Sequence, residues 1–206
     1  MSSPRLSLVV ASELALALAL ALTIPSTTYA QQGGNGGRGN MPARGGNMPA
    51  PQASTTLAGD FAADFASQED LILKAADAMP AEHFDFKPTA PQQSFGERVM
   101  HIVQVNGGLL RALGGKTPAP MINMQAKSKA DVMAALKQSF DWGLMVVKEF
   151  NDQQLVERVM PPRFMGPSAS RARIVAFSLV HTEDIYGQMV VYLRLNGVTP
   201  PASAAP

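Results

Sequence analysis

Residues 170–201 read SRARIVAFSLVHTEDIYGQMVVYLRLNGVTPP, and this stretch decides the fold. Apolar residues recur in it at spacings of three and four, which predicts a single helix of about eight turns. Ser168 and Ser170 are both suitable N-caps, because a serine hydroxyl can accept a hydrogen bond from a free amide of the first turn. Gly197 suits the left-handed position just after a helix, and the two prolines that follow prevent its continuation.

One side of this predicted helix is apolar except in its middle. His181, Asp184 and Gln188 place three polar side chains near a face that should point inward, and buried polar groups are costly unless they find partners. These three residues are therefore the first candidates for a functional site. The stripe that we expect to face the core comprises Ile174, Phe177, His181, Ile185, Gln188, Tyr192 and Leu195.

Three earlier segments have the same helical periodicity. Leu57 to Met79 forms the first, and Ser94 begins the second as part of a capping box with Glu97. Ser128 precedes the third, and no segment alternates long enough to predict a strand, although 151–167 could contain a short extended piece. The sequence thus predicts an all-α protein, an antiparallel up-and-down four-helix bundle with long connections.

The amino-terminal part has the features of an export signal. Arg5 precedes an apolar run at 14–24, and small residues lead up to Ala30, after which we expect cleavage. The alternative is a retained membrane anchor, for which the run is short. Residues 1–30 are thus predicted to be a signal peptide, which makes the protein exported, either periplasmic or secreted, with no membrane contact after cleavage.

A low-complexity linker rich in Gly, Pro and Asn follows at 31–56, so the folded domain is predicted to span 57–203. The chain contains no cysteine, which excludes disulfides and thiol chemistry by the protein itself. Its formal charge of +1 argues against nucleic acid as a partner.

Histidine is the side chain that most suggests chemistry here. His83 lies in a loop without companions at metal-ligand spacing, whereas His101 and His181 lie within predicted helices that could face each other. Imidazole is a common ligand of Zn, Ni and Fe, and Asp184, one turn after His181, is a candidate third ligand of such a divalent transition metal. For each histidine taken separately, a satisfied core residue is the simpler interpretation.

Two stretches resemble those typical of the DinB-like superfamily of metal-binding four-helix bundles. They are HFDFKPTAPQQSFGERVMHIVQVNGG at 83–108 and the stretch from His181 to Pro201. The resemblance implies a divalent metal held by three histidines, one from the second helix and two from the last. Known relatives include thiol-dependent transferases and isomerases, and many have no known activity. Carried over to this chain, the ligands are His101 and His181, and the third position falls on Ile185.

An isoleucine cannot bind a metal, so the implied site is incomplete. Either Asp184 substitutes, giving at most a metal-dependent hydrolase or transferase, or the bundle is non-catalytic and serves as a binding or interaction module for a small-molecule ligand. A third hypothesis is a homodimer whose long loops are covered by the partner. The sequence predicts no particular substrate.

Overall fold

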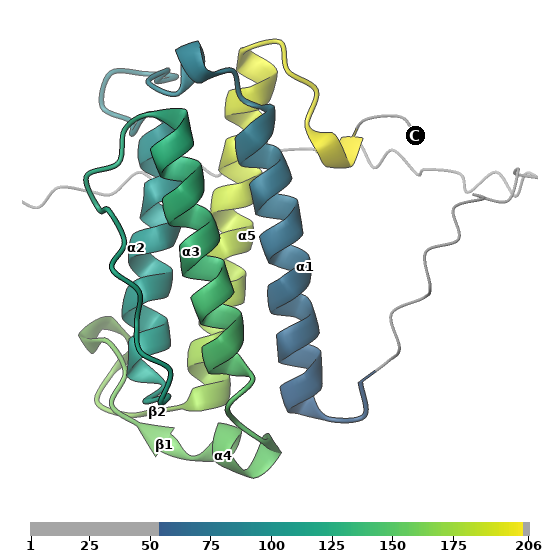
Figure 1. Cartoon of the computed structure of the whole chain (residues 1–206), viewed down its shortest axis with the longest axis vertical. Coiled ribbons are helices and arrows are strands. Elements are labelled where there is room, and N and C mark those ends of the chain that lie inside the picture. The colour runs from purple at the N-terminus through teal and green to yellow at the C-terminus, as the bar shows by residue number, and fades with distance from the viewer. Residues whose placement is uncertain (1–53, 204–206) are drawn as a thin grey trace, which may run out of the picture. The chain divides into compact units, whose positions relative to one another are not determined.

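The computed structural model describes residues 54–203 (Figure 1). The predicted signal peptide and nearly all of the predicted linker lie outside these residues. Four long helices form the domain, and a small hairpin and three 3-10 turns connect or follow them. The long helices are α1 (Leu57–Ala78), α2 (Phe95–Ala112), α3 (Lys129–Val147) and α5 (Arg171–Leu195).

The predicted four-helix bundle is confirmed, but the order of its helices is not that of a simple up-and-down bundle. Both α1 and α2 pack against α3 and α5, so α1 and α2 are diagonal to each other. Figure 1 shows α1 and α5 running in one direction and α2 and α3 in the other. The neighbouring helices α2 and α3 are therefore parallel, which corrects the predicted antiparallel arrangement.

Contacts at both ends of α3 establish this direction. At its start, Lys129 Nζ lies 3.1 Å from the Asp77 carboxylate at the end of α1 and over the ring of Phe84, which precedes α2. At its end, Trp142 Nε1 donates to the carbonyl of Thr117, just after α2, at 3.2 Å. The starts of α2 and α3 therefore lie at one end of the bundle, and their ends lie at the other.

The connection between α2 and α3 makes the parallel arrangement possible. The 18 residues of α2 span about 27 Å at 1.5 Å per residue. Residues 113–128 could extend over about 50 Å, so they can return along the whole bundle. The connection does so, as Figure 1 shows. The unusual loop length was visible in the sequence, but its use as a crossover was not predicted.

A small hairpin precedes α5. It lies at the end of the bundle opposite to the start of α2. After the short α4 (Asp152–Val156), β1 (Arg158–Val159) pairs antiparallel with β2 (Ala169–Ser170). Arg158 faces Ser170 and Val159 faces Ala169 in this register. The expected extended piece within 151–167 corresponds to β1.

Serine and threonine hydroxyls cap the helices as the sequence suggests. The Ser94–Glu97 capping box is present at the start of α2. Ser170 caps α5, whereas Ser168, the alternative, instead accepts a hydrogen bond from Arg158 Nε at 2.8 Å. Gly197 has a φ of +70°, the left-handed conformation expected just past the helix.

The inward face of α5 differs in part from the predicted stripe. Phe177 and Leu195 are exposed, and Ser178 and Thr182 are buried in their place. The reason is that Ser178 finds a buried partner, Asn106 on α2, which a periodicity based on hydropathy alone cannot anticipate. The residues of α5 that are buried are Ile174, Val175, Ser178, Thr182, Ile185, Met189, Tyr192 and Leu193.

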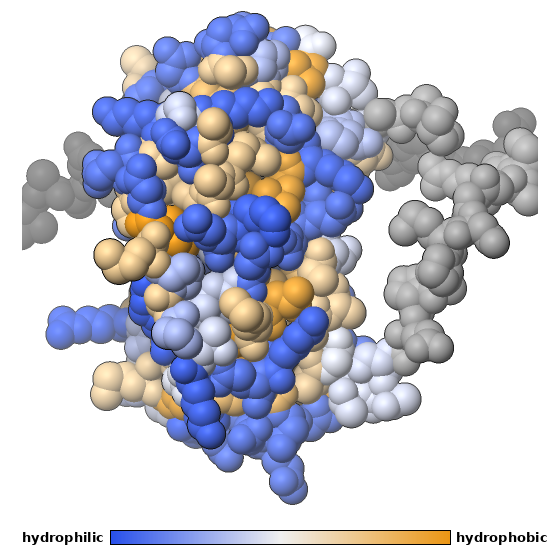
Figure 2. Space-filling model, viewed as in Figure 1, coloured by the Kyte–Doolittle hydropathy of each residue, from blue (hydrophilic) through white to orange (hydrophobic). Residues whose placement is uncertain are grey.

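On the face of the molecule that carries α3, hydrophobic side chains form small patches between hydrophilic ones (Figure 2). Among residues 54–203, no helix combines the length and the apolar character needed to cross a membrane.

The close packing of α3 against its neighbours depends on Gly143. A Cβ atom at this position would lie 2.6 Å from Phe65 on α1 and 2.7 Å from Leu110 on α2. Gly143→Ala should therefore lower the free energy of unfolding, because overpacking costs about 1–3 kcal/mol, more than the roughly 1 kcal/mol that alanine gains over glycine within a helix.

Gly108→Ala is the matched control, since a Cβ at this helical position would meet nothing within 4 Å. It should stabilise the protein by up to about 1 kcal/mol in urea unfolding. Equal effects of the two substitutions would contradict the packing described here.

Candidate functional site

His101 and His181 face each other across the antiparallel helices α2 and α5. Their Nε2 atoms are 3.2 Å apart, and the ring centroids are 5.1 Å apart with the planes inclined at 60°. Both side chains are half-buried. The structure therefore brings together two of the three site residues predicted from the sequence.

Two hydrogen bonds between α2 and α5 flank this pair. On one side, the Tyr192 hydroxyl donates to the carbonyl of Gln93, just before α2, at 2.8 Å. On the other side, the Ser178 hydroxyl donates to Asn106 Oδ1 at 2.9 Å, and both of these side chains are buried. These bonds fix the register of the two helices, and with it the approach of the imidazoles.

Burial is the main influence on the protonation of both histidines. It lowers the pKa of His101, and the positive charge of Arg98 lowers it further. It also lowers the pKa of His181, where His101 adds to the effect and Asp184 opposes it. Both imidazoles are thus neutral at pH 7, the form that can share a hydrogen bond or bind a metal.

The spacing of the two Nε2 atoms suits a common metal ligand sphere. Two nitrogen ligands at 2.0–2.1 Å from a tetrahedral metal are about 3.3 Å apart, close to the observed 3.2 Å. The same distance also suits a hydrogen bond between two neutral imidazoles of opposite tautomers. The pair therefore fits either arrangement.

The supporting groups fit a metal less well. A metal-binding histidine usually donates its second ring N–H to a carboxylate or a carbonyl. The Nδ1 atom of His181 is buried without a hydrogen-bond partner. A metal bound here would thus lack one of the interactions that normally orient its ligand.

Asp184, the candidate third ligand, lies outside this pair. Its side chain is exposed, and Asp184 Oδ2 accepts a hydrogen bond from Gln188 Nε2 at 2.9 Å. Within residues 54–203, no group of three His, Cys, Asp or Glu side chains is arranged to hold a metal ion. Gln188, the third polar residue of the predicted inward face, contacts Asp184 rather than either histidine.

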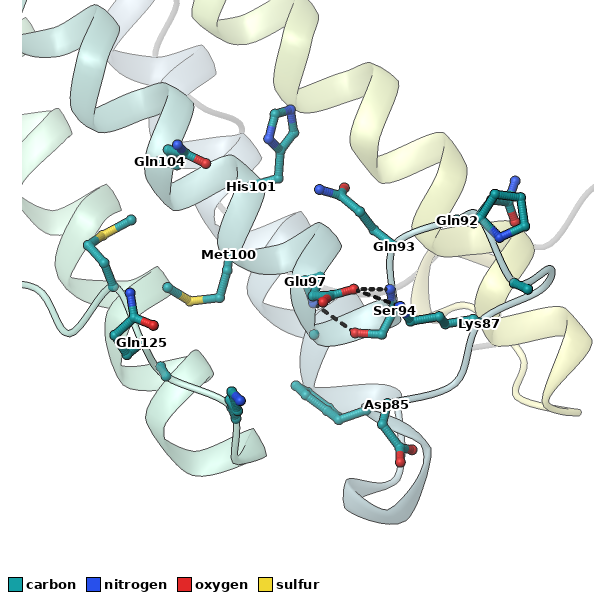
Figure 3. A pocket seen from close by; sticks show the side chains of 17 residues that line it. Asp85, Lys87, Gln92, Gln93, Ser94, Glu97, Met100, His101, Gln104 and Gln125 are labelled. Carbon is teal, nitrogen blue, oxygen red and sulfur yellow. Dashed lines mark hydrogen bonds and ion pairs between the residues drawn. The ribbon is translucent and has the colours of Figure 1, made fainter.

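A polar pocket of about 690 Å³ opens beside His101 (Figure 3). Its walls are the loop before α2, the first turns of α2 and the end of the crossover. Two lysines and two carboxylates balance each other around it, and four glutamine amides add donors and acceptors. These polar residues, together with His101, are Asp85, Lys87, Gln92, Gln93, Glu97, Gln104, Gln125 and Lys127.

Such a lining suits an uncharged or zwitterionic polar molecule better than a strongly charged one. Glu97 is already engaged, since its carboxylate accepts a hydrogen bond from the backbone amide of Ser94, and this bond lowers its pKa. The sequence pointed to Glu97 as a helix cap, and the structure agrees. The pocket itself was not predicted, because its walls come from three separate segments of the chain.

The remaining candidates have structural roles. Tyr192, which the predicted stripe placed toward the core, is buried, and so is Trp142. His83 lies in the 3-10 turn Ala81–His83, apart from the other histidines. Four methionines lie in the connections between the long helices: Met121, Met124 and Met160 are exposed, and Met165 is buried.

Comparison with known proteins decides the family. A sequence model described as the DinB family matches residues 52–206. The chain belongs to the DinB family. The resemblance seen in the sequence is thereby confirmed at the level of the family.

Two Bacillus proteins are similar to this DinB-family protein at low sequence identity. An uncharacterised Bacillus subtilis (strain 168) protein, YjoA, is 19% identical over 135 residues, which cover 66% of this chain and 88% of YjoA. The crystal structure of a DinB-like protein from Bacillus cereus ATCC 10987 matches with a TM-score of 0.62 and 19% identity, covering 71% of this chain and 96% of that one. The crystal structure of YjoA matches with a TM-score of 0.54 and 16% identity, covering 68% and 94%. At this identity the two structures support the fold alone.

The lowered pKa values predict how stability depends on pH. Both histidines have a lower pKa in the folded chain than the roughly 6.5 of an unfolded one, so the unfolded chain binds more protons between these values. Their contribution to stability should be complete above about pH 6.5 and should fall as the pH drops below it.

Urea unfolding between about pH 7.5 and pH 5.5 measures this effect. The double variant His101→Gln/His181→Gln should lose stability less steeply than the wild type over this range, whereas His83→Gln should keep the wild-type slope. Identical slopes for all three proteins would show that the pair does not titrate as described.

Proposed function

We propose that this DinB-family protein is exported and binds a divalent transition metal weakly through the Nε2 atoms of His101 and His181. The observation that supports this best is the 3.2 Å spacing of two neutral imidazole nitrogens. Zn, Ni and Fe(II) are the metals that imidazole ligands suit.

A metal at this pair would have open positions, because only two protein ligands are available to it among residues 54–203. It would lower the pKa of a bound water or thiol, which is the chemistry that a hydrolase or a transferase requires. The residues around the pocket would bind the small-molecule ligand: the glutamine amides can donate and accept hydrogen bonds to it, next to His101.

The proposed affinity is low for two reasons. The protein supplies two ligands rather than three, and the unpartnered Nδ1 of His181 removes support that is typically worth 10–100-fold in metal affinity. Ile185, at the position where the family resemblance implies the third histidine, is buried and apolar.

The second candidate function is a metal-free binding module. It is favoured by the hydrogen bond that two neutral imidazoles can share at this distance, and by the position of Asp184, which is exposed and bonded to Gln188. In this case the His101–His181 pair stabilises the α2–α5 contact beside the pocket.

Elemental analysis separates the two candidates. The protein from Gln31 onwards, purified without a histidine tag and incubated with Zn, Ni or Fe(II), should retain up to about one equivalent of metal. His181→Ala should abolish the retention, and His83→Ala should not. No metal in the wild type under any of these conditions would leave the binding module as the function.

A gain-of-function variant tests the incomplete ligand set. Ile185→His should raise Zn affinity by tenfold or more, about 1.4 kcal/mol, if this residue occupies the third family position. Val191→His adds a histidine on the exposed side of the same helix and should leave the affinity unchanged. Equal affinity of the wild type and a folded Ile185→His variant would show that position 185 does not face the metal.

Export is tested by the amino terminus of the mature protein. When the full chain is expressed in a bacterium with a periplasm, we expect the recovered protein to begin at Gln31. A protein that retains residues 1–30 and sediments with membranes would show the anchor instead.

A further inference from the structure

The segment 158–173, which forms the hairpin and the first residues of α5, is rich in positive charge. It contains four arginines and no acidic residue, although the chain as a whole has a formal charge of only +1. Arg171 forms an ion pair with Glu157 and packs on the ring of Phe150. The other three arginines are exposed: Arg158, Arg163 and Arg173.

Two of these exposed arginines are held against the loop that closes the hairpin. Arg158 donates from Nε to the hydroxyl of Ser168 at 2.8 Å and from its Nη2 to the carbonyl of the same residue at 2.7 Å. Arg173 donates from Nη1 to the carbonyl of Met165 at 3.1 Å. A guanidinium group has five N–H donors, so each keeps donors for an acceptor outside the chain. The positive charges are thus ordered before any partner binds.

Exposed apolar side chains lie among these charges. Met160 and Phe164 are 83% and 66% exposed, and Phe164 lies against Phe177 of α5 with ring centroids 5.3 Å apart. Arg173 is one turn before Phe177, so the two side chains are neighbours on the helix surface. We call these six residues the hairpin patch: Arg158, Met160, Arg163, Phe164, Arg173 and Phe177. Basic side chains beside exposed apolar ones are typical of segments that bind at the surface of an anionic membrane.

The start of α1 lies at the same end of the bundle as the hairpin (Figure 1). Asp152, which precedes the hairpin, accepts hydrogen bonds from the backbone amides of Leu57 and Ala58. The chain before α1 leads back over the predicted linker to the apolar run at 14–24, which enters a membrane during the proposed export. A Gly-rich linker of this length has an average end-to-end distance of about 30 Å. The hairpin end of the domain is therefore the end that is kept near the membrane.

We propose that the hairpin patch binds anionic phospholipid at a membrane surface, with the arginines against the phosphate groups and Met160 and Phe164 among the headgroups. The burial of these apolar side chains favours lipid over nucleic acid or an acidic protein, which would attract the same charges. The proposal departs from the expectation of no membrane contact after cleavage, which considered the amino-terminal run alone. It does not depend on the proposed metal. Because the pocket beside His101 lies at the opposite end of the bundle, the docked domain presents it away from the membrane.

Cosedimentation with vesicles tests the proposal, with the protein from Gln31 onwards so that the apolar run is absent. It should bind vesicles of phosphatidylcholine mixed with phosphatidylglycerol about tenfold or more tightly than vesicles of phosphatidylcholine alone. Binding should weaken between about 0.05 M and about 0.5 M salt, since salt screens the charges. Inorganic phosphate should not compete at constant ionic strength, because it offers no surface for the apolar side chains.

Two substitutions test the patch itself. Arg163→Gln should weaken binding about fivefold, the typical contribution of one basic residue near an anionic surface. Phe164→Ser should weaken it by about tenfold through the loss of apolar burial. Lys74→Gln and Val191→Ser are the matched controls, because both side chains are exposed but lie near the ends of α1 and α5, away from the hairpin. Circular dichroism checks that all four variants remain folded.

Several outcomes would overturn the proposal: no binding to the anionic vesicles, equal binding to vesicles of both compositions, or equal binding of the wild type and both patch variants. Tight binding of polyglutamate or duplex DNA without binding of vesicles would assign the patch to an acidic macromolecule and overturn it as well. Metal retention measured on the same preparations reports separately on the histidine pair, so a failure of one proposal is distinguishable from a failure of the other.

Discussion

The contact between α2 and α5 is the constraint on which the site depends. Two hydrogen bonds, Tyr192 to Gln93 and Ser178 to Asn106, hold these helices in register on either side of the histidine pair. One of them lies in the core, where a polar side chain left without its partner costs about 1–3 kcal/mol. A slip along the helices would break both bonds, so the distance between the imidazoles is set by the fold rather than by the imidazoles themselves.

The crossover between α2 and α3 determines where the pocket lies. Because α2 and α3 are parallel, their starts meet at one end of the bundle, and residues 124–127 arrive there just before α3 begins. With an antiparallel connection, the end of α2 would lie beside the start of α3, far from this wall. The pocket beside His101 is thus a direct result of the helix order.

Much of the fold could be predicted from the sequence because it depends on local signals. Periodicity located the four long helices, and the hydroxyl caps at Ser94 and Ser170 located their starts. The order of the helices could not be predicted, since a long loop can connect α2 to either an antiparallel or a parallel α3. The burial of Ser178 was not predicted either, because it depends on a hydrogen bond to Asn106, 72 residues away. A polar residue within an apolar helix was the available signal for Asn106, as it was for the histidines.

The candidate site was predictable in two of its residues but not in its geometry. The sequence identified His101 and His181, and the structure places them together. It also proposed Asp184, whose distance from the pair depends on the rotation of α5 about its own axis. That rotation is decided by the core packing of residues such as Ile185 and Met189, and the spacing of residues in the sequence does not determine this packing.

The crossover also separates two tasks within one small domain. The stability of the bundle comes from residues inside the four helices, whereas part of the pocket wall is a segment that contributes a single buried side chain between 114 and 128, that of Ala126. Loops of this kind tolerate substitution and insertion far better than helices do. The lining of this pocket can therefore diverge by changes in the crossover, while the scaffold and the histidine pair remain the same.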